Sequence, residues 1–408
     1  MLEMNIFVLL VLAMGLIIIL LRRHVPIGPC MLAGGLFIWL VKAPELHYLV
    51  DAFTDTLRLS RTYDILFALY FVMCLEIELR TSGALSGMVQ ALQRIFSSSK
   101  VTLAVMPAFL GLLPSLGGAR FSAPIVAEAS SGMPLTCEHK AAINFWFRHI
   151  FEFSSPIIPG MIMACNIAGV AYGDFIKHLC WLTVLAFATG WFVLIRPITD
   201  VFAKDATKAV ATSRRGLTDL CLALAPVILN FIMVVFFDVS ASFGMGLVTV
   251  TLFCVLRQMG RSVSLKEVVT GAADFKMFIN VLLILYFIQI LTVTDVLTEI
   301  VTAFQSSPFP VPVIIACVSI IIGILTGMSQ GHVAIVMPIV AAMQTGSLNL
   351  AGVAMAFGVA GQMLTPTHMC LVVTVDYFKS NFFKTLEPVL RCEIIILTIF
   401  SVYSWLTW

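Results

Sequence analysis

The chain has 408 residues, of which 60% are hydrophobic and only 11% are charged. Soluble globular domains carry about a quarter charged residues, so this composition excludes a soluble protein and predicts an integral membrane protein. The net charge of +2 gives no indication of nucleic-acid binding, and the ten cysteines lie scattered, most of them in apolar runs, with no Cys-x-x-Cys pair.

A succession of apolar runs predicts an all-α polytopic membrane protein, because a helix needs about 20 apolar residues to cross a bilayer. The first run lacks a basic leader and a cleavage site and is followed by Arg22 and Arg23, so we expect a retained span rather than a signal peptide. Two crossings, over residues 141–170 and 350–373, are broken by prolines. The other predicted crossings are residues 5–21, 27–41, 64–79, 175–195, 217–237, 242–256, 275–291 and 386–405, which gives about ten in total.

Two pairs of shorter apolar segments lie between these crossings, within residues 101–131 and 311–344. A helix of about 13 residues reaches only ~20 Å, which is short of the ~30 Å hydrocarbon core. We therefore expect each pair to form a re-entrant helical hairpin rather than two crossings. Three amphipathic segments, residues 51–61, 86–95 and 293–304, are expected to lie along the membrane interface.

Basic residues are distributed unevenly between the two sides of this layout. If the N-terminus is external, nearly all Lys and Arg fall on the cytoplasmic side, as the positive-inside rule requires. Arg120 and Arg148 are left inside the membrane. The pattern predicts a multi-pass protein of the cell inner (cytoplasmic) membrane with both termini external. The external positions hold only Lys42, Arg58, Arg61 and Lys177.

The second half of the chain repeats motifs of the first half in the same order. The segment APIVAEA (123–129) matches MPIVAAM (337–343), and LPSLGG (113–118) corresponds to LTGMSQG (325–331). A third pair, FSSP (153–156) and MLTP (363–366), lies at nearly the same separation. Each half contains five crossings, and an odd number places the second half in the opposite orientation. We therefore predict two inverted repeats.

The predicted domains follow this repeat. The first repeat, residues 1–198, comprises scaffold helices 1–100, a hairpin 101–131, a broken helix 141–170 and a closing helix 175–195. A basic cytoplasmic linker, residues 199–215, joins it to the second repeat, residues 216–408. The second repeat comprises scaffold helices 217–305, a hairpin 311–344, a broken helix 350–373 and a closing helix 386–405.

The two hairpin tips and the two broken helices contain the residues expected to bind substrate and ion. Inverted repeats with discontinuous helices are typical of secondary transporters, whose site lies near the bilayer midplane where the breaks meet. Freed carbonyls and Ser or Thr hydroxyls are oxygen ligands for a small cation such as Na⁺, and half-helix N-termini supply amide donors for an anion. The predicted site residues are Ser115, Gly117, Gly118, Arg120, Ser154, Ser155, Pro156, Thr326, Gly327, Ser329, Gln330, His332, Thr365, Pro366, Thr367 and His368.

Arg120 is the expected anion contact, because an arginine at membrane depth is costly unless it meets a partner. The alternative is a structural pair of Arg120 with Glu128 or Glu152. Arg148 and Glu152 are four residues apart, so a local ion pair on one helix face is predicted there. Glu128 or Glu152 could instead carry protons.

Two histidines, His332 and His368, fall in matching segments of the second half and could sense protons or donate to substrate. Each could equally be a satisfied polar residue, and His149 stays unassigned. No catalytic motif is found, so we do not expect an enzyme. We expect no metal centre or cofactor beyond Na⁺ as a coupling ion, because His368 with Cys370 alone is too few ligands.

Three segments resemble a known family. PSLGGARFSAPIVAE, INFWFRHIFEFSSPIIPG and GQMLTPTHMCLVVTVDYF are similar to the prokaryotic integral membrane family catalogued as domain of unknown function 401. That family looks like a distant member of the ion transporter superfamily of gluconate, citrate, dicarboxylate and arsenite carriers. The resemblance implies an elevator mechanism with a scaffold that forms a homodimer, although the chain lacks the Ser-Asn-Thr tip motif of the dicarboxylate carriers.

These observations together predict a secondary transporter in the lipid bilayer that couples Na⁺ or H⁺ to a small anionic solute, a carboxylate. A sodium/proton antiporter is the first alternative, and a passive channel or a membrane enzyme is the second.

Overall fold

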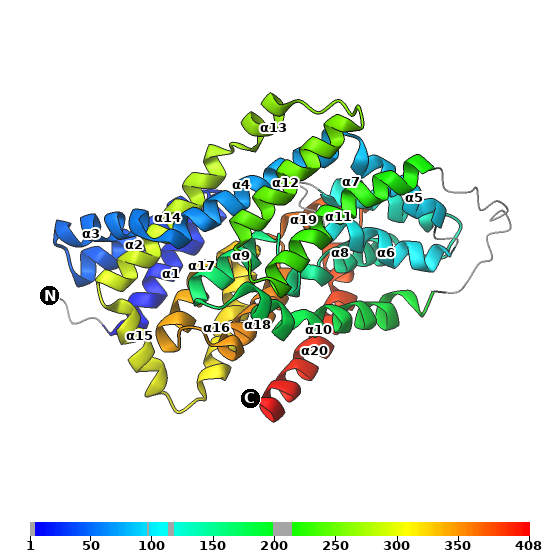
Figure 1. Ribbon diagram of the computed structural model, residues 1–408. Helices are drawn as coiled ribbons and strands as arrows, with labels where there is room; N and C mark the ends of the chain where they lie inside the picture. Colours follow the sequence, from blue (N-terminus) through cyan, green and yellow to red (C-terminus); the bar gives the residue numbers. More distant parts are fainter. Residues whose placement is uncertain (1–4, 96–97, 113–117, 199–213) are drawn as a thin grey trace. The chain divides into compact units, whose positions relative to one another are not determined.

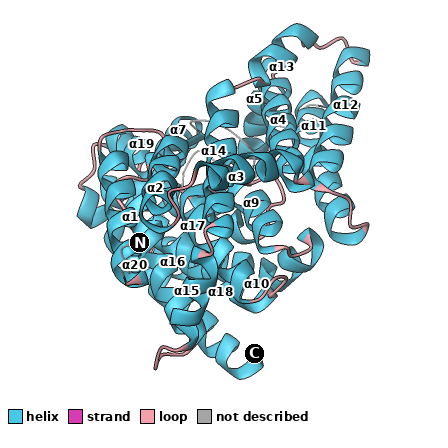
Figure 2. Ribbon diagram, turned by 90° about the vertical axis from the view of Figure 1, so that its left-hand side faces the viewer, coloured by secondary structure: helices cyan, strands magenta, loops and turns pink. Residues whose placement is uncertain are grey.

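A computed structural model describes residues 5–95, 98–112, 118–198 and 214–408, without the side chains of residues 93–94, 118–121 and 214–215. All regular structure in these ranges is helical (Figure 2), as predicted. The helices are labelled in chain order in Figure 1.

Two compact units make up the chain, and each contains segments from both sequence halves. The first unit comprises Met1–Phe67, Ile162–Ala171 and Asp274–Thr365, and the second comprises Ala68–Met161, Tyr172–Ala273 and Pro366–Trp408. The two units are distinguished by their internal contacts and not by symmetry. The division of the chain into two inverted repeats therefore stays a prediction.

The first unit contains the second predicted hairpin. Its two arms, α16 and α17, pack against each other and against α18, while α14 packs on α2 and α3. The helices of this unit are α1 (Ile6–Arg22), α2 (Ile27–Lys42), α3 (Leu46–Arg58), α14 (Phe275–Val293), α15 (Val296–Gln305), α16 (Val311–Thr326), α17 (Ser329–Met343) and α18 (Leu348–Met363).

Glycines bring α16 and α18 into backbone contact. A Cβ atom added at Gly323 would lie 2.3 Å from the carbonyl oxygen of Gly358, and one added at Gly361 would lie 2.2 Å from that of Ile320. Only residues without a side chain permit this approach, which is how helices in membranes pack closely.

The second unit contains the first predicted hairpin, whose arms α6 and α7 also pack together. The elements of this unit are α5 (Ala84–Ile95), α6 (Ser99–Leu112), α7 (Gly118–Ala129), α8 (Cys137–Arg148), the 3₁₀ helix η1 (Ile150–Phe153), α10 (Tyr172–Gly190), the π-helix η2 (Trp191–Ile195), α11 (Arg214–Phe236), α12 (Ala241–Gln258), α13 (Leu265–Ala272), α19 (Met369–Phe378) and α20 (Phe382–Thr407). Two helices, α4 (Ser60–Thr81) and α9 (Pro159–Ala168), have residues in both units.

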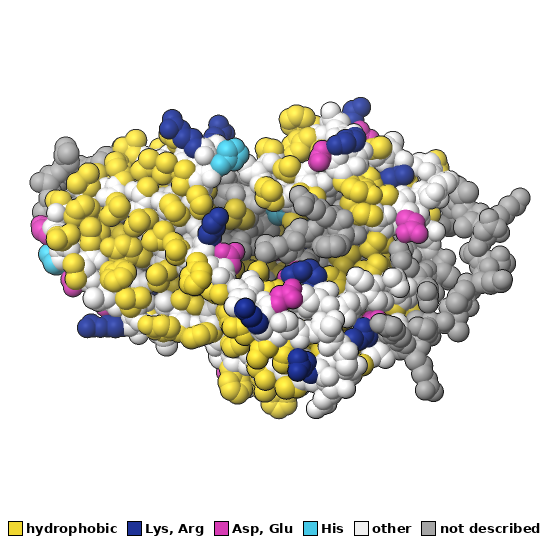
Figure 3. Space-filling model, turned by 90° about the horizontal axis from the view of Figure 1, so that it is seen from above, with side chains coloured by type: hydrophobic (Ala, Val, Ile, Leu, Met, Phe, Trp, Pro, Cys, Tyr) yellow, Lys and Arg dark blue, Asp and Glu magenta, His cyan; other side chains and the backbone are white. Residues whose placement is uncertain are grey.

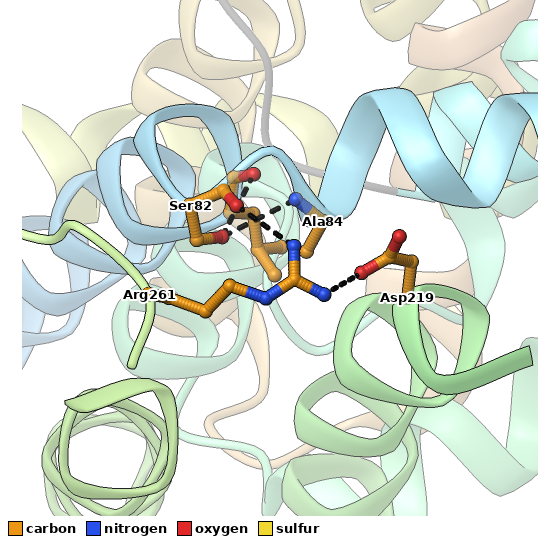
Figure 4. A network of polar contacts seen from close by, with 5 residues as sticks. Ser82, Ala84, Asp219 and Arg261 are labelled. Carbon is orange, nitrogen blue, oxygen red and sulfur yellow. Dashed lines mark hydrogen bonds and ion pairs between the residues drawn. The ribbon is translucent and has the colours of Figure 1, made fainter. Parts of the chain in front are cut away.

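An ion pair between the half-buried Arg261 and the buried Asp219 joins three segments of the second unit (Figure 4). The Arg261 guanidinium, from the loop after α12, donates to the Asp219 carboxylate on α11 and to the Ser82 carbonyl, 3.2 Å away. The Ser82 hydroxyl in turn accepts a hydrogen bond from the Ala84 amide at the start of α5. Polar groups buried in an apolar unit are thus matched with partners here.

Within the described ranges, five helices are long and apolar enough to cross a membrane. Large hydrophobic side chains are exposed on several of them, including Phe236, Phe243 and Phe275. Figure 3 shows one face on which hydrophobic side chains predominate. The protein is therefore membrane-embedded, whereas the predicted ten crossings and the re-entrant course of the hairpins stay predictions. The five candidate spans are Tyr172–Ile195, Gly216–Phe236, Ala241–Gln258, Leu265–Val293 and Phe382–Thr407.

Candidate functional site

The first broken helix is interrupted where it was predicted to be. The helix α8 ends at Arg148, His149 forms its C-cap, and a single 3₁₀ turn follows before α9 begins at Pro159. Pro156 and Pro159 cannot donate backbone hydrogen bonds, and a proline at the first helical position suits the start of α9. The regular α-helical hydrogen bonding is thus interrupted between Arg148 and Pro159.

Arg148 at this break is buried, with 8% of its surface exposed. Its Nη1 donates to the Ser122 hydroxyl of α7 over 3.4 Å, while its Nε has no hydrogen-bond partner among the described residues. The buried Ser155 hydroxyl likewise has no partner in the described part of the chain. A guanidinium in such surroundings is costly unless an anion neutralises it, because a buried charge needs a partner.

The predicted arrangement of Arg148 and Glu152 on one α-helical face is wrong. The α-helix stops at Arg148, and Glu152 belongs to the 3₁₀ turn, where residues four apart no longer lie above one another. Pro156 disfavours a helical conformation at Ser155, so the chain does not resume an α-helix directly after the 3₁₀ turn. Glu152 is buried, and a pair with Arg148 stays a prediction.

Two histidines meet in the second unit. His149 follows α8, and His368 forms the N-cap of α19, which packs against α8. Their Nε2 atoms lie 3.0 Å apart, and both rings contact the Phe145 ring. The sequence did not identify His149 as a site residue, because its partner His368 is 219 positions away. Its position next to Arg148 at a predicted helix break was the one feature that could have indicated a role.

The second hairpin tip, in the first unit, is well described. Gly327 ends α16 in the left-handed conformation, with φ of 67°, which glycine adopts without strain. The Thr326 hydroxyl donates to the Ile322 carbonyl over 2.8 Å, and Ser329 begins α17 as a buried residue. Gln330 is half-buried. The tip therefore holds hydroxyl oxygens at a point where the helical backbone is interrupted.

Behind this tip lie two buried polar side chains that lack partners. His332 of α17 and Gln362 of α18 are both 0% exposed, and neither ring nitrogen nor either amide atom has a hydrogen-bond partner in the described part of the chain. A Cβ added at Gly358 would lie 2.1 Å from the His332 ring, and Gln362 is one turn further on the same helix face. Sequence reasoning missed Gln362, a single polar residue within an apolar helix.

The remaining predicted residues are distributed as follows. Ser115 and Gly117 lie outside the described residues, and Gly118 and Arg120 belong to α7 without described side chains. The Ser154 hydroxyl accepts a hydrogen bond from Thr183 over 2.8 Å. In the second broken helix Thr365 is buried, whereas Pro366 and Thr367 are exposed, and Glu128 on α7 is also exposed. Convergence of the four breaks on one site stays a prediction.

The fold is similar to that of a solved membrane protein. The crystal structure of the Alcanivorax borkumensis YdaH transporter, described as having an unusual topology, matches with a TM-score of 0.60 over 90% of this chain and 90% of that chain. The two sequences are 13% identical, so the likeness concerns the fold alone. No curated protein matches the sequence. The model of the family described as protein of unknown function DUF401 matches residues 6–407, and because this is nearly the whole chain, the protein belongs to that family.

Proposed function

We propose that the protein is a cation-coupled secondary transporter of a small anionic solute, a carboxylate, that works by an elevator mechanism as a homodimer in the inner membrane. The fold it shares with a transporter supports this class of function. The observation that carries the proposal is Arg148, a buried guanidinium at a helix break whose Nε has no partner among the described residues.

An anion is the ligand that this environment favours. A guanidinium offers two parallel donors that match the two oxygens of a carboxylate. The Ser122 hydroxyl lies beside the guanidinium and can donate to the same ligand, and the buried Ser155 hydroxyl of the same break is a further candidate donor. Arg148 thereby takes the role that the sequence predicted for Arg120, which remains a second candidate contact.

The coupling cation, Na⁺ or H⁺, is assigned to the interrupted backbone. Thr326, Ser329 and Thr365 place hydroxyl oxygens at helix ends, and Na⁺ as a hard cation prefers such oxygen ligands. Protons would instead use a buried titratable side chain such as Glu152 or His332.

Arg148→Gln tests the anion role. A charge-assisted hydrogen bond contributes about 1.5–3 kcal/mol, so this variant should bind carboxylates about 10- to 100-fold more weakly. It should still fold, because it removes a buried charge rather than creating one. The measurement is a thermal-shift titration of purified protein with a panel of small carboxylates, with and without Na⁺, followed by uptake into proteoliposomes.

Arg196→Gln is the matched control, since Arg196 is exposed and lies over the Phe192 ring. It should leave carboxylate affinity unchanged. If Arg148→Gln binds every carboxylate as the unaltered protein does, Arg148 is not the anion contact.

A sodium/proton antiporter is the second candidate, because Glu152 is a buried carboxyl group at the same break. In that case vesicles with an imposed Na⁺ gradient would change internal pH without any carboxylate present, and Glu152→Gln would abolish the change. Transport insensitive to both ion gradients would favour a passive channel.

A further inference from the structure

Three potential metal ligands come together at the two helix breaks of the second unit. His149, His368 and Cys370 each offer one ligand atom, and these atoms lie within 4.8 Å of one another. Both imidazoles are buried, whereas Cys370 is half-buried. His149 is 219 positions from His368, so no metal-ligand spacing is visible in the sequence.

The tautomer of His149 follows from its hydrogen bond. Its Nδ1 lies 2.7 Å from the Phe145 carbonyl oxygen. A carbonyl oxygen can only accept, so Nδ1 carries the hydrogen and the Nε2 lone pair of the neutral ring points at His368. Histidines that bind metals are held in this way, with the second ring nitrogen donating to a backbone carbonyl or carboxylate.

The spacing of the two rings suits a shared cation. Two Nε2 atoms bound tetrahedrally at about 2.0–2.1 Å from Zn²⁺ would stand about 3.3 Å apart. The Nε2 atoms lie 3.0 Å apart, so opening by a few tenths of an ångström admits the ion. His368 then needs only to move its hydrogen from Nε2 to Nδ1, so that both lone pairs face one point.

The thiol completes a three-ligand set. Cys370 lies in the first turn of α19, two residues after the N-cap His368. A tetrahedral Zn²⁺ with one sulfur and one nitrogen ligand places these atoms about 3.5 Å apart, which a rotation of the cysteine side chain can reach from within 4.8 Å. The Phe145 ring packs against both imidazoles and provides the apolar shell that surrounds protein metal sites.

We propose that His149, His368 and Cys370 form a binding site for a borderline divalent cation of the Zn²⁺ class. Two imidazoles and one thiolate select such ions over Na⁺, Mg²⁺ or Ca²⁺, which prefer oxygen ligands. Three protein ligands leave the fourth tetrahedral position open to water or to a solute. The bound ion joins the end of α8 to the start of α19, so it links the two broken helices at their interruptions.

Co²⁺ is the probe that tests this site in the full-length protein, purified in detergent and stripped of metal with a chelator. One equivalent of Co²⁺ should give visible bands of tetrahedral geometry together with a near-ultraviolet thiolate-to-Co²⁺ band. Zn²⁺ should displace both sets of bands. Cys370→Ser should lose the thiolate band.

His149→Asn and His368→Asn should each weaken Co²⁺ binding at least tenfold, because loss of even an outer-shell partner weakens metal affinity about 10- to 100-fold. The matched controls are Cys180→Ser, an exposed thiol on α10, and His178→Asn, whose ring stacks on Trp408. Both controls should bind Co²⁺ as the unaltered protein does.

The proposal is overturned if one equivalent of Co²⁺ gives no thiolate band in the unaltered protein, or if that band persists in Cys370→Ser. Unchanged affinity in both histidine variants would also overturn it. The spectrum of the unaltered protein decides the matter even if a variant fails to fold. Because no transport is measured, the result is independent of whether the protein carries an anion.

Discussion

At the scale of single residues, the buried polar atoms without partners are the most informative. A buried amide or imidazole that makes no hydrogen bond costs about 1–3 kcal/mol. His332 on α17 and Gln362 on α18, two helices that pack together, contribute four such atoms within the part of the chain that the structure describes. Apolar residues at both positions would avoid this cost.

Gln362→Met tests the cost of this arrangement. Methionine has nearly the volume of glutamine but no atom that needs a hydrogen bond, so the variant should raise the free energy of unfolding by about 1–3 kcal/mol. The measurement is thermal or denaturant unfolding of the purified protein in detergent.

Gln330→Met serves as the control, because Gln330 is half-buried at the hairpin tip and its replacement should stay within about 0.5 kcal/mol. A lower free energy of unfolding for the Gln362→Met variant would contradict this interpretation. It would show that the Gln362 amide has a partner that stabilises the native state.

The residues at the breaks could be predicted in part. Proline, glycine and hydroxyl residues within apolar sequence mark an interruption by their local chemistry, and Ser155, Gly327 and Ser329 lie where expected. His149 and Gln362 could not be identified, because their significance depends on neighbours distant in the chain.

At the scale of elements, the contact between α16 and α18 depends on glycine. The hypothetical Cβ of Gly361 meets the Ile320 carbonyl oxygen and the Ile324 amide, which are backbone atoms and cannot rotate away. Any side chain at this position must push the two helices apart.

Gly361→Ala should therefore lower the free energy of unfolding by about 1–3 kcal/mol, the usual cost of overpacking. Gly15→Ala, in α1 with no atom within 4 Å of the added carbon, is the matched control. It should be neutral or stabilise by up to about 1 kcal/mol through helix propensity. Equal stability of the two variants in detergent would show that α16 and α18 do not approach as described.

The ends of a helix could be predicted from the sequence where its apolar run is long. The predicted start of α2 at residue 27 and of α14 at residue 275 are both confirmed. The eight-residue α13 was missed, because a short segment with both Lys and Glu shows no apolar run. The polar N-terminal turn of α8 was missed for the same reason, although Thr136 caps it through a hydrogen bond with His139.

At the scale of the whole molecule, composition predicts the membrane class and the distribution of charge predicts the sidedness. Membrane class is confirmed by five candidate spans and exposed apolar surface, and sidedness stays a prediction. The repeat could be seen in the sequence because short motifs recur, whereas the two compact units could not, since each combines segments of both halves.

Reporter fusions test the predicted sidedness. Alkaline phosphatase, which folds only outside the cytoplasm, should be active when fused after Trp408, and a cytoplasm-dependent fluorescent protein at the same point should be dark. Fusions ending within the predicted cytoplasmic linker 199–215 should give the reverse result. An inactive phosphatase at Trp408 would contradict an external C-terminus and, with it, the predicted number of crossings.

The ion pair between Arg261 and the buried Asp219 has a consequence for how the sequence can vary. Asp219 also lies directly against Gly87, where any added carbon would meet its carboxylate. Loss of Arg261 alone leaves a buried carboxylate unpaired, and a larger residue at position 87 displaces the carboxylate from the guanidinium. A substitution at position 87, 219 or 261 is therefore tolerated only together with matching substitutions at the other two, although the three positions lie in separate parts of the chain.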